Sequence, residues 1–360
     1  SSSRGLGDVY KRQNTAGAAR AQAYAVMAGM NALGLALGPL IGGFLTTYYS
    51  WRWAFRLEVL VLIIVLLMSN VIPKDVLGKV RPKLDTVGVI WQAAAMIFFV
   101  LGTLLISSYG LFLAKQPFVI GDYEFAPFGL SIVPFLIGAG LLCLLQFVRW
   151  ERKLDSQGEA VLVDLKLFSI SDFVKGLNVR FIQTALMAGT TFAVPLFLQV
   201  TYGLSAFETG FILLGLTGGL MLTDLTATRI GLQYLPKQKV MWGFLVSIVG
   251  IFLMIGFMLV GDAPGGLVPG LFVYGMGIGL IASQIVNLIM STVTGKQTPE
   301  ASGVTSTLET LGSSVGTAIV GTVLVVALTG GIDRMVAQST VFTPEVKQQI
   351  SQDMATSAEV

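Results

Sequence analysis

Long apolar stretches alternate with short polar ones along most of the chain. A helix that crosses the hydrocarbon core of a bilayer needs about 20 mostly apolar residues, and about nine stretches meet that length. None of them shows the strict apolar and polar alternation that indicates a membrane β-barrel. The pattern therefore predicts an all-α, polytopic membrane helical bundle. The expected spans are Ala23–Leu45, Trp53–Ile72, Val87–Tyr109, Phe128–Val148, Gly176–Tyr202, Thr209–Thr228, Val240–Val260, Leu267–Thr292 and Val304–Leu328.

Composition agrees with a protein that lies in the lipid bilayer. Hydrophobic residues make up 54% of the chain and charged residues only 12%, whereas about 25% of the residues of a soluble domain are charged. We therefore expect a multi-pass protein of the cell membrane.

The placement of Lys and Arg predicts how the spans are oriented. If the first span runs outward, the loops that hold most Lys and Arg, such as Lys74–Lys83 and Arg149–Lys175, lie on one side of the membrane. Cytoplasmic loops carry an excess of these residues. We therefore expect these loops to face the cytoplasm.

Cysteine and histidine content limits the chemistry that is available. The chain has one cysteine, Cys143, and no histidine, which excludes disulfide bonds, Cys and His metal sites and Ser-His catalysis. The longest expected loop, Arg149–Lys175, is too short for an enzyme domain. We expect no enzyme, no metal site, no cofactor and no nucleic-acid partner, and protein partners stay unknown.

Four glycines and a proline interrupt the first span, in the sequence GLALGPLIGG. Gly34, Gly38 and Gly42 repeat every four residues and so share one helix face, which Gly43 widens. Membrane helices associate through close backbone contact at small residues, so general helix packing is one interpretation. Pro39 is expected to bend the helix.

The same stretch resembles the antiporter signature G-x3-G-P-x2-G-G of the major facilitator superfamily, found on the fifth helix of drug:proton antiporters. The sequence WRWAFRLEV resembles the start of the sixth helix in the fourteen-helix antiporters, although Glu58 and Leu60 replace the usual asparagine and proline. PLFLQVTYGLSAFETG, PGLFVYGMGIGL and SGVTSTLETLGSSVGTAIVG resemble helices of the second half. Together these motifs cover nearly all of Asn14–Leu328.

This resemblance implies the major facilitator fold, with the expected spans as helices five to thirteen of fourteen and the chain truncated at both ends. The opening SSSRGLGDVYKRQ is expected to be a cloning scar, with a native leader as the alternative. The expected parts are this suspected non-native scar (1–13), the last two helices of the N-terminal half (14–72), an inserted helix pair with its linker (73–150), five helices of the C-terminal half (151–330) and an external tail (331–360).

The resemblance also implies a function. It implies export of small amphipathic or cationic molecules by alternating access, with protons as the coupled partner and the proton gradient as the energy source. Two alternatives stay open: export of an endogenous metabolite or siderophore on the same fold, and a membrane sensor or assembly subunit that does not transport.

Charged and polar side chains within the spans are the candidate site residues, because such groups are costly in lipid. Glu309 shares a helix face with Ser302, Ser306, Ser313 and Gly316, and we expect it either to bind protons or to have a structural role. Arg180 is expected to pair with Glu309, to bind an anionic substrate group, or to reach lipid phosphates.

The remaining candidates are weaker. Gln284 and Asn287 share a face of another span and are expected to contact substrate or to bond to a neighbouring helix. Glu58 is a candidate for the proton path at the outer mouth. Asp224 and Arg229 lie where the resemblance places a degenerate loop motif, and we expect them to form either a cytoplasmic gate or a solvated helix end.

Overall fold

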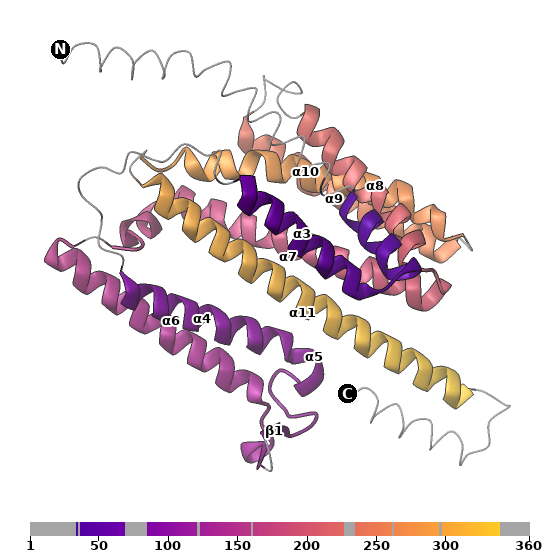
Figure 1. The fold of residues 1–360 in the computed structure, drawn as a ribbon, viewed down its shortest axis with the longest axis horizontal. Coiled ribbons are helices and arrows are strands. Elements are labelled where there is room, and N and C mark those ends of the chain that lie inside the picture. The colour runs from indigo at the N-terminus through magenta and orange to yellow at the C-terminus, as the bar shows by residue number, and fades with distance from the viewer. Residues whose placement is uncertain are drawn as a thin grey trace. The chain divides into compact units, whose positions relative to one another are not determined.

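The structure, a computed structural model, describes residues 34, 37–68, 85–120, 123–159, 161–226, 235–260, 263–294 and 297–338. Most of these residues are helical (Figure 1). Six helical segments in the described part are long and apolar enough to cross a membrane, and they fall on the third to eighth expected spans. The all-α membrane fold is therefore confirmed. These segments are Thr86–Leu104, Ile132–Gln157, Ser171–Tyr202, Ala206–Thr223, Pro236–Leu259 and Pro264–Met290.

The chain divides into two compact units. Unit 1 is Ser1–Pro73 with Phe197–Gln284, and unit 2 is Lys74–Leu196 with Ile285–Val360. The domain boundaries expected from the sequence stay a prediction.

In unit 1, glycines on α8 (Ala206–Thr226), α9 (Pro236–Val260) and α10 (Leu267–Met290) let the helices approach closely. A Cβ at Gly277 of α10 would lie 2.5 Å from the backbone nitrogen of Ser247, and one at Gly250 of α9 would lie 2.6 Å from the Cα of Tyr274. Tyr274 is fully buried. Small residues thus supply the backbone contact that holds membrane helices together. The unit also contains a helical segment at residues 37–48, α3 (Trp51–Met68) and the 3-10 turn η4 (Pro264–Gly266).

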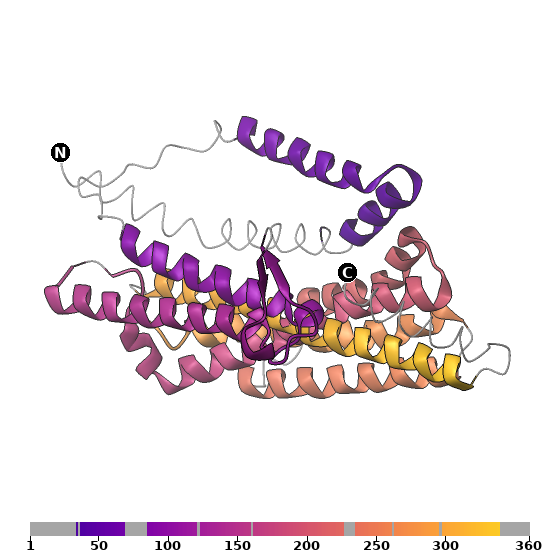
Figure 2. The ribbon, with the colours of Figure 1, turned by 90° about the horizontal axis from the view of Figure 1, so that it is seen from below.

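In unit 2, α4 (Thr86–Leu104) and α6 (Ile132–Gln157) lie side by side (Figures 1 and 2). The connection between them contains α5 (Ile106–Tyr109), an antiparallel pair of β1 (Phe118–Ile120) and β2 (Tyr123–Phe125), and the 3-10 turn η2 (Pro127–Gly129). The strand pair was not expected from the sequence. The unit is completed by η3 (Leu165–Ser169), α7 (Ser171–Tyr202, up to Leu196) and α11 (Thr298–Gln338).

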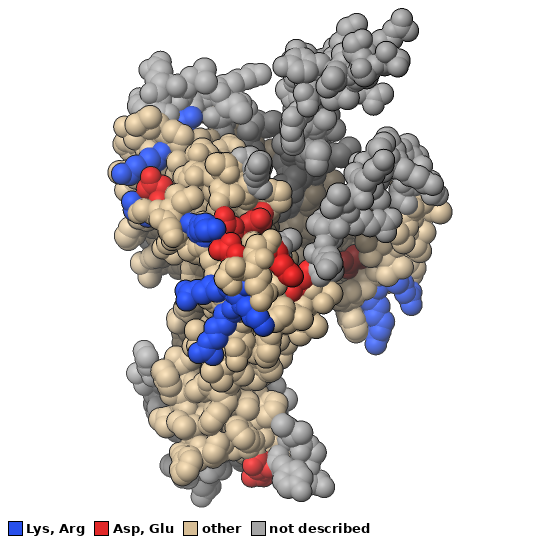
Figure 3. Space-filling model, turned by 90° about the vertical axis from the view of Figure 1, so that its left-hand side faces the viewer, with Lys and Arg blue, Asp and Glu red and all other residues tan. Residues whose placement is uncertain are grey.

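The ends of α6 follow from local sequence. The Ser131 hydroxyl accepts the Val133 N–H at the N-terminal end, 3.2 Å away, which satisfies one of the free amides of the first turn. Gly158 ends the helix at φ 71°, a left-handed conformation that favours glycine. Figure 3 faces the end of the unit at which α4 begins and α6 ends, and charged side chains gather there. One exposed ion pair at this end joins Lys166 to Asp155, 3.3 Å apart.

Asp164 ties the segment after α6 to the start of α11. Its Oδ2 accepts from Gln297 Nε2 at 2.9 Å, and its Oδ1 accepts the Lys166 N–H at 2.9 Å. Its own N–H donates to Glu300 Oε2, 2.8 Å away. Burial alone raises the pKa of the Asp164 carboxyl, but these hydrogen bonds and the Lys166 charge outweigh it and hold the pKa below its usual value.

Acid should therefore loosen this attachment. Because the folded pKa of Asp164 is depressed, its contribution is present above the pKa of an unfolded aspartate, about 3.9, and is lost as pH falls through the lower folded pKa. We expect Asp164→Asn to lower the melting temperature at neutral pH, and the difference from wild type to vanish on acidification. Asp172→Asn, in an exposed pair with Lys175, is the control and should show no such difference. A constant difference at every pH would contradict the assignment.

Candidate functional site

Two glycines bring α11 against α7. A Cβ at Gly312 would lie 2.6 Å from the carbonyl oxygen of Phe181, and one at Gly316 would lie 2.6 Å from the Cα of Ala185. A residue larger than glycine at either position would therefore clash with α7 unless the backbone shifted. The two helices are thereby held at a separation at which side chains one turn away can meet.

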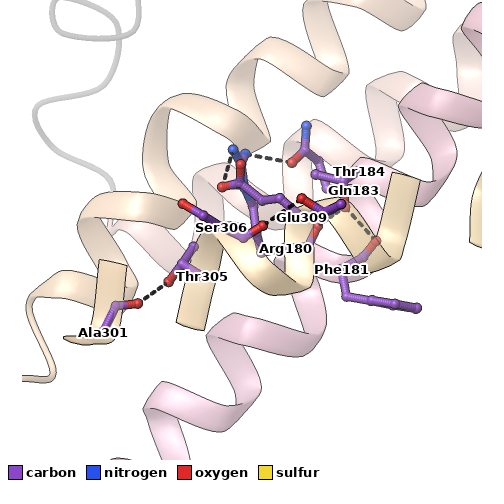
Figure 4. A network of polar contacts seen from close by, with 9 residues as sticks. Arg180, Phe181, Gln183, Thr184, Ala301, Thr305, Ser306 and Glu309 are labelled. Carbon is purple, nitrogen blue, oxygen red and sulfur yellow. Dashed lines mark hydrogen bonds and ion pairs between the residues drawn. The ribbon is translucent and has the colours of Figure 1, made fainter. Parts of the chain in front are cut away.

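Arg180 of α7 and Glu309 of α11 form an ion pair at this contact (Figure 4). Nε and Nη2 of Arg180 each lie 2.7 Å from Glu309 Oε1. Arg180 Nη1 also donates to Gln183 Oε1, 2.7 Å away. The Arg180 side chain is 15% exposed and that of Glu309 33%. A charge in a membrane helix needs a partner of this kind, and pairing with Glu309 was one of the three roles expected for Arg180.

Gln183 is a site residue that the sequence analysis missed. It is 2% exposed and holds the guanidinium of Arg180 from one turn further along α7. Its spacing of three residues from Arg180 is the signal that marks it, because residues three apart are neighbours on a helix surface.

The ion pair borders an open groove of about 450 Å³ on α7 and α11. The hydroxyls of Thr184 and Thr310 donate to carbonyls of their own helices, so their lone pairs remain available to a further donor. The groove therefore offers a carboxylate and several neutral acceptors. Its lining residues are Thr184, Met187, Ala188, Thr191, Glu309, Thr310, Ser313 and Ser314.

Other expected site residues are not among those that line this groove. Gln284 and Asn287 both lie on α10, but Gln284 belongs to unit 1 and Asn287 to unit 2. Gln284 Nε2 donates to Ser283 Oγ at 3.3 Å. Their expected roles stay predictions.

The candidates for the outer mouth and the gate are placed only in part. Glu58 is an exposed residue of α3, a helix on which Arg56 lies over the ring of Trp53, 4.9 Å from its centroid. Asp224 lies on α8, and Arg229 is outside the described residues. A proton path through Glu58 and a gate at Asp224 and Arg229 stay predictions.

The glycine motif makes its described contacts at Gly43 and Pro39. A Cβ at Gly43 would lie 2.5 Å from the carbonyl oxygen of Ala206, and one at Gly210 of α8 would lie 2.7 Å from the carbonyl oxygen of Pro39. No described atom lies within 4 Å of the Cβ positions of the remaining motif glycines, Gly34, Gly38 and Gly42. In the described part of unit 1 the motif packs on α8, and the role of the four-residue stripe stays a prediction.

Comparison with known families agrees with the helical pattern. The sequence matches the family described as the Major Facilitator Superfamily over residues 6–148 and 86–317.

Three curated relatives have names that state a transport or resistance role. The chain is 28% identical over 300 residues to the "Probable actinorhodin transporter" of Streptomyces coelicolor. The aligned region covers 81% of this chain and 48% of the relative. It is 26% identical to the "Lincomycin resistance protein LmrB" of Listeria monocytogenes, over 80% of this chain and 57% of the relative. It is 25% identical to the "Multidrug efflux pump LfrA" of Mycolicibacterium smegmatis, over 89% of this chain and 59% of the relative. The chain thus spans about half the length of the relatives that it matches.

Gly316→Ala should separate α7 from α11. The added methyl meets the backbone of Ala185, so we expect a loss of about 1–3 kcal/mol, typical of overpacking. Gly303 of the same helix is a matched control, because no described atom lies within 4 Å of its Cβ position. Gly303→Ala should be neutral or stabilising by up to about 1 kcal/mol, since alanine favours helices. Unfolding in detergent measures both, and equal effects would contradict the close contact.

A double-mutant cycle should detect the ion pair. Glu309→Gln and Arg180→Gln are each expected to destabilise the fold, and their combination should cost less than the two separate losses together. We expect a coupling free energy of about 1–3 kcal/mol from denaturant unfolding. The same cycle on the exposed pair Asp172–Lys175 should show no measurable coupling. Equal coupling in the two pairs would argue against a special role for Arg180 and Glu309.

Proposed function

The chain belongs to the Major Facilitator Superfamily, and we propose that it is part of a proton-coupled exporter of small amphipathic or cationic molecules that works by alternating access. Its apolar helices make it a multi-pass protein of the cell membrane. The fourteen-helix drug:proton antiporters are the subfamily that we propose for it, on the strength of the GLALGPLIGG and WRWAFRLEV motifs.

The arrangement of Arg180 and Glu309 carries the proposal. Glu309 is a carboxylate on a helix of a membrane protein, and it faces both a cation and an open, hydroxyl-lined groove. Protonation of Glu309 removes its charge and breaks the ion pair with Arg180. Loss of the proton restores the pair. The two states differ in which group neutralises the carboxylate, which is the kind of two-state element that a transport cycle requires.

The names of the relatives bear on the cargo. Lincomycin resistance and multidrug efflux are said of two of them and support a drug-like substrate for this chain. The first relative is named for actinorhodin transport, which also supports a small-molecule cargo, and export of an endogenous metabolite stays the alternative. Both alternatives use the same fold and the same proton site.

Glu309→Gln in the intact protein tests the function. We expect it to abolish the release of protons that follows addition of substrate to energised membrane vesicles, because glutamine neither binds nor releases a proton. A panel of lipophilic cations and a panel of metabolites, compared in the same assay, separate the two kinds of cargo. Asp172→Asn is the control, since Asp172 is exposed on α7, and it should couple as wild type does. Normal coupling in Glu309→Gln would remove this residue from the mechanism.

A further inference from the structure

Two carboxyl groups meet in unit 2, away from the groove. Asp85 precedes the first turn of α4, and Glu151 lies near the C-terminal end of α6. The side chain of Glu151 is 0% exposed. The side chains of Asp85 and Glu151 lie within hydrogen-bonding range of each other. Asp85 also contacts Trp150, the neighbour of Glu151 on α6, which lies 65 positions away in the sequence.

One oxygen of each carboxyl group is fully engaged. Asp85 Oδ1 accepts the backbone N–H of Gly88 at 3.0 Å and the indole N–H of Trp150 at 2.9 Å. Glu151 Oε2 accepts the backbone N–H groups of Leu162 and Val163, at 2.9 and 3.3 Å. These bonds orient the two carboxyl groups, and they join α4, α6 and the segment after α6.

The other oxygen of each group, Asp85 Oδ2 and Glu151 Oε1, is buried and has no hydrogen-bond donor among the described residues. Both lie around the same small space, because a Cβ at Gly88 would touch Asp85 Oδ2 and would lie 2.8 Å from Glu151 Oε1. Glycine at position 88 is what leaves room for the two oxygens to approach. Two bare carboxylates at such a distance repel strongly, since burial weakens screening by solvent.

We propose that Asp85 and Glu151 form a binding site for a single proton, which the two carboxyl groups share and which closes the contact between α4, α6 and residues 161–164. The proton forms an O–H bond with one of the free oxygens and a hydrogen bond to the other. It removes one of the two negative charges and supplies the donor that both buried oxygens lack. Paired carboxyl groups that share one proton are an established solution to this repulsion.

A metal ion suits the site less well than a proton. Calcium takes about 6–8 oxygen ligands, and magnesium requires octahedral coordination. The described residues contain no group of three or more acidic, cysteine or histidine side chains. The two free oxygens form too small a set for such a cation, whereas a proton needs two acceptors only.

Several charged groups on the described neighbouring elements have partners of their own. Asp155 of α6 pairs with Lys166, and Lys153 lies over the ring of Trp150, 5.6 Å from its centroid. Asp164 binds Gln297, and Glu300 of α11 accepts the Asp164 N–H. The negative charge of Asp85 disfavours a second negative charge on Glu151. A proton shared with Asp85 removes this repulsion.

Infrared spectroscopy of the intact protein in detergent tests the proposal directly, and it requires no transport. Carboxyl groups in water are ionised at neutral pH, so a C=O stretching band of a protonated carboxyl group at neutral pH marks a retained proton. We expect this band in wild type and its loss in Glu151→Gln. This variant should still fold, because glutamine keeps an acceptor for Leu162 and Val163 and adds a donor toward Asp85. Asp155→Asn, which removes an exposed carboxylate of the same helix, should leave the band unchanged.

The pH dependence of the melting temperature provides a second readout. Because the folded state holds a proton that the unfolded chain releases more readily, wild type should lose stability as pH rises through the loss of that proton. Glu151→Gln and Asp85→Asn should not show this loss, whereas Asp155→Asn should show it in full. Absence of the band from wild type, its persistence in Glu151→Gln, or identical alkaline destabilisation in all variants would overturn the proposal. None of these results depends on whether the protein exports anything.

Discussion

The contact between the backbones of α7 and α11 is the constraint on which the candidate site depends. Gly312 and Gly316 let the two helices approach so closely that a methyl group does not fit between them, and this separation allows Arg180 and Glu309 to pair across the interface. In lipid there is no hydrophobic drive that would force the helices together. Close packing and the ion pair therefore support each other: the glycines set the distance, and the pair removes the cost of two isolated charges.

Glu309 and Glu151, both in unit 2, are compensated in different ways. Glu309 is paired with a guanidinium, keeps a third of its side chain exposed and lines the groove, as the change of partner that we propose requires. Glu151 is fully buried. Its partners are backbone N–H groups and a second carboxyl group, whereas the partner of Glu309 is a cation. The first arrangement suits a group that changes state during a cycle. The second suits a group whose proton holds elements together.

Hydropathy was sufficient to predict the helical fold, because a membrane span needs a long apolar stretch that no other element requires. It also placed Glu309 and Arg180 within spans, but it left open whether they pair, since pairing depends on which helices are neighbours.

Gln183 was missed because a glutamine in an apolar helix has no motif. Asp85 and Glu151 were missed because each lies within an expected loop, where a charge is ordinary. Only the packing of α4 on α6 brings them together. The strand pair β1 and β2 was missed because its strands are only three residues long, too short to show an alternation of apolar and polar residues.

The two oxygens of Asp85 have separate tasks. One caps α4 by accepting the Gly88 N–H, while the other faces Glu151. Serine, with its single hydroxyl oxygen, is an equally good residue for the first task and unsuited to the second. The two roles of Asp85 are therefore separable. A single substitution of Asp85 by serine during evolution would remove the shared proton, while α4 would still begin at the same residue.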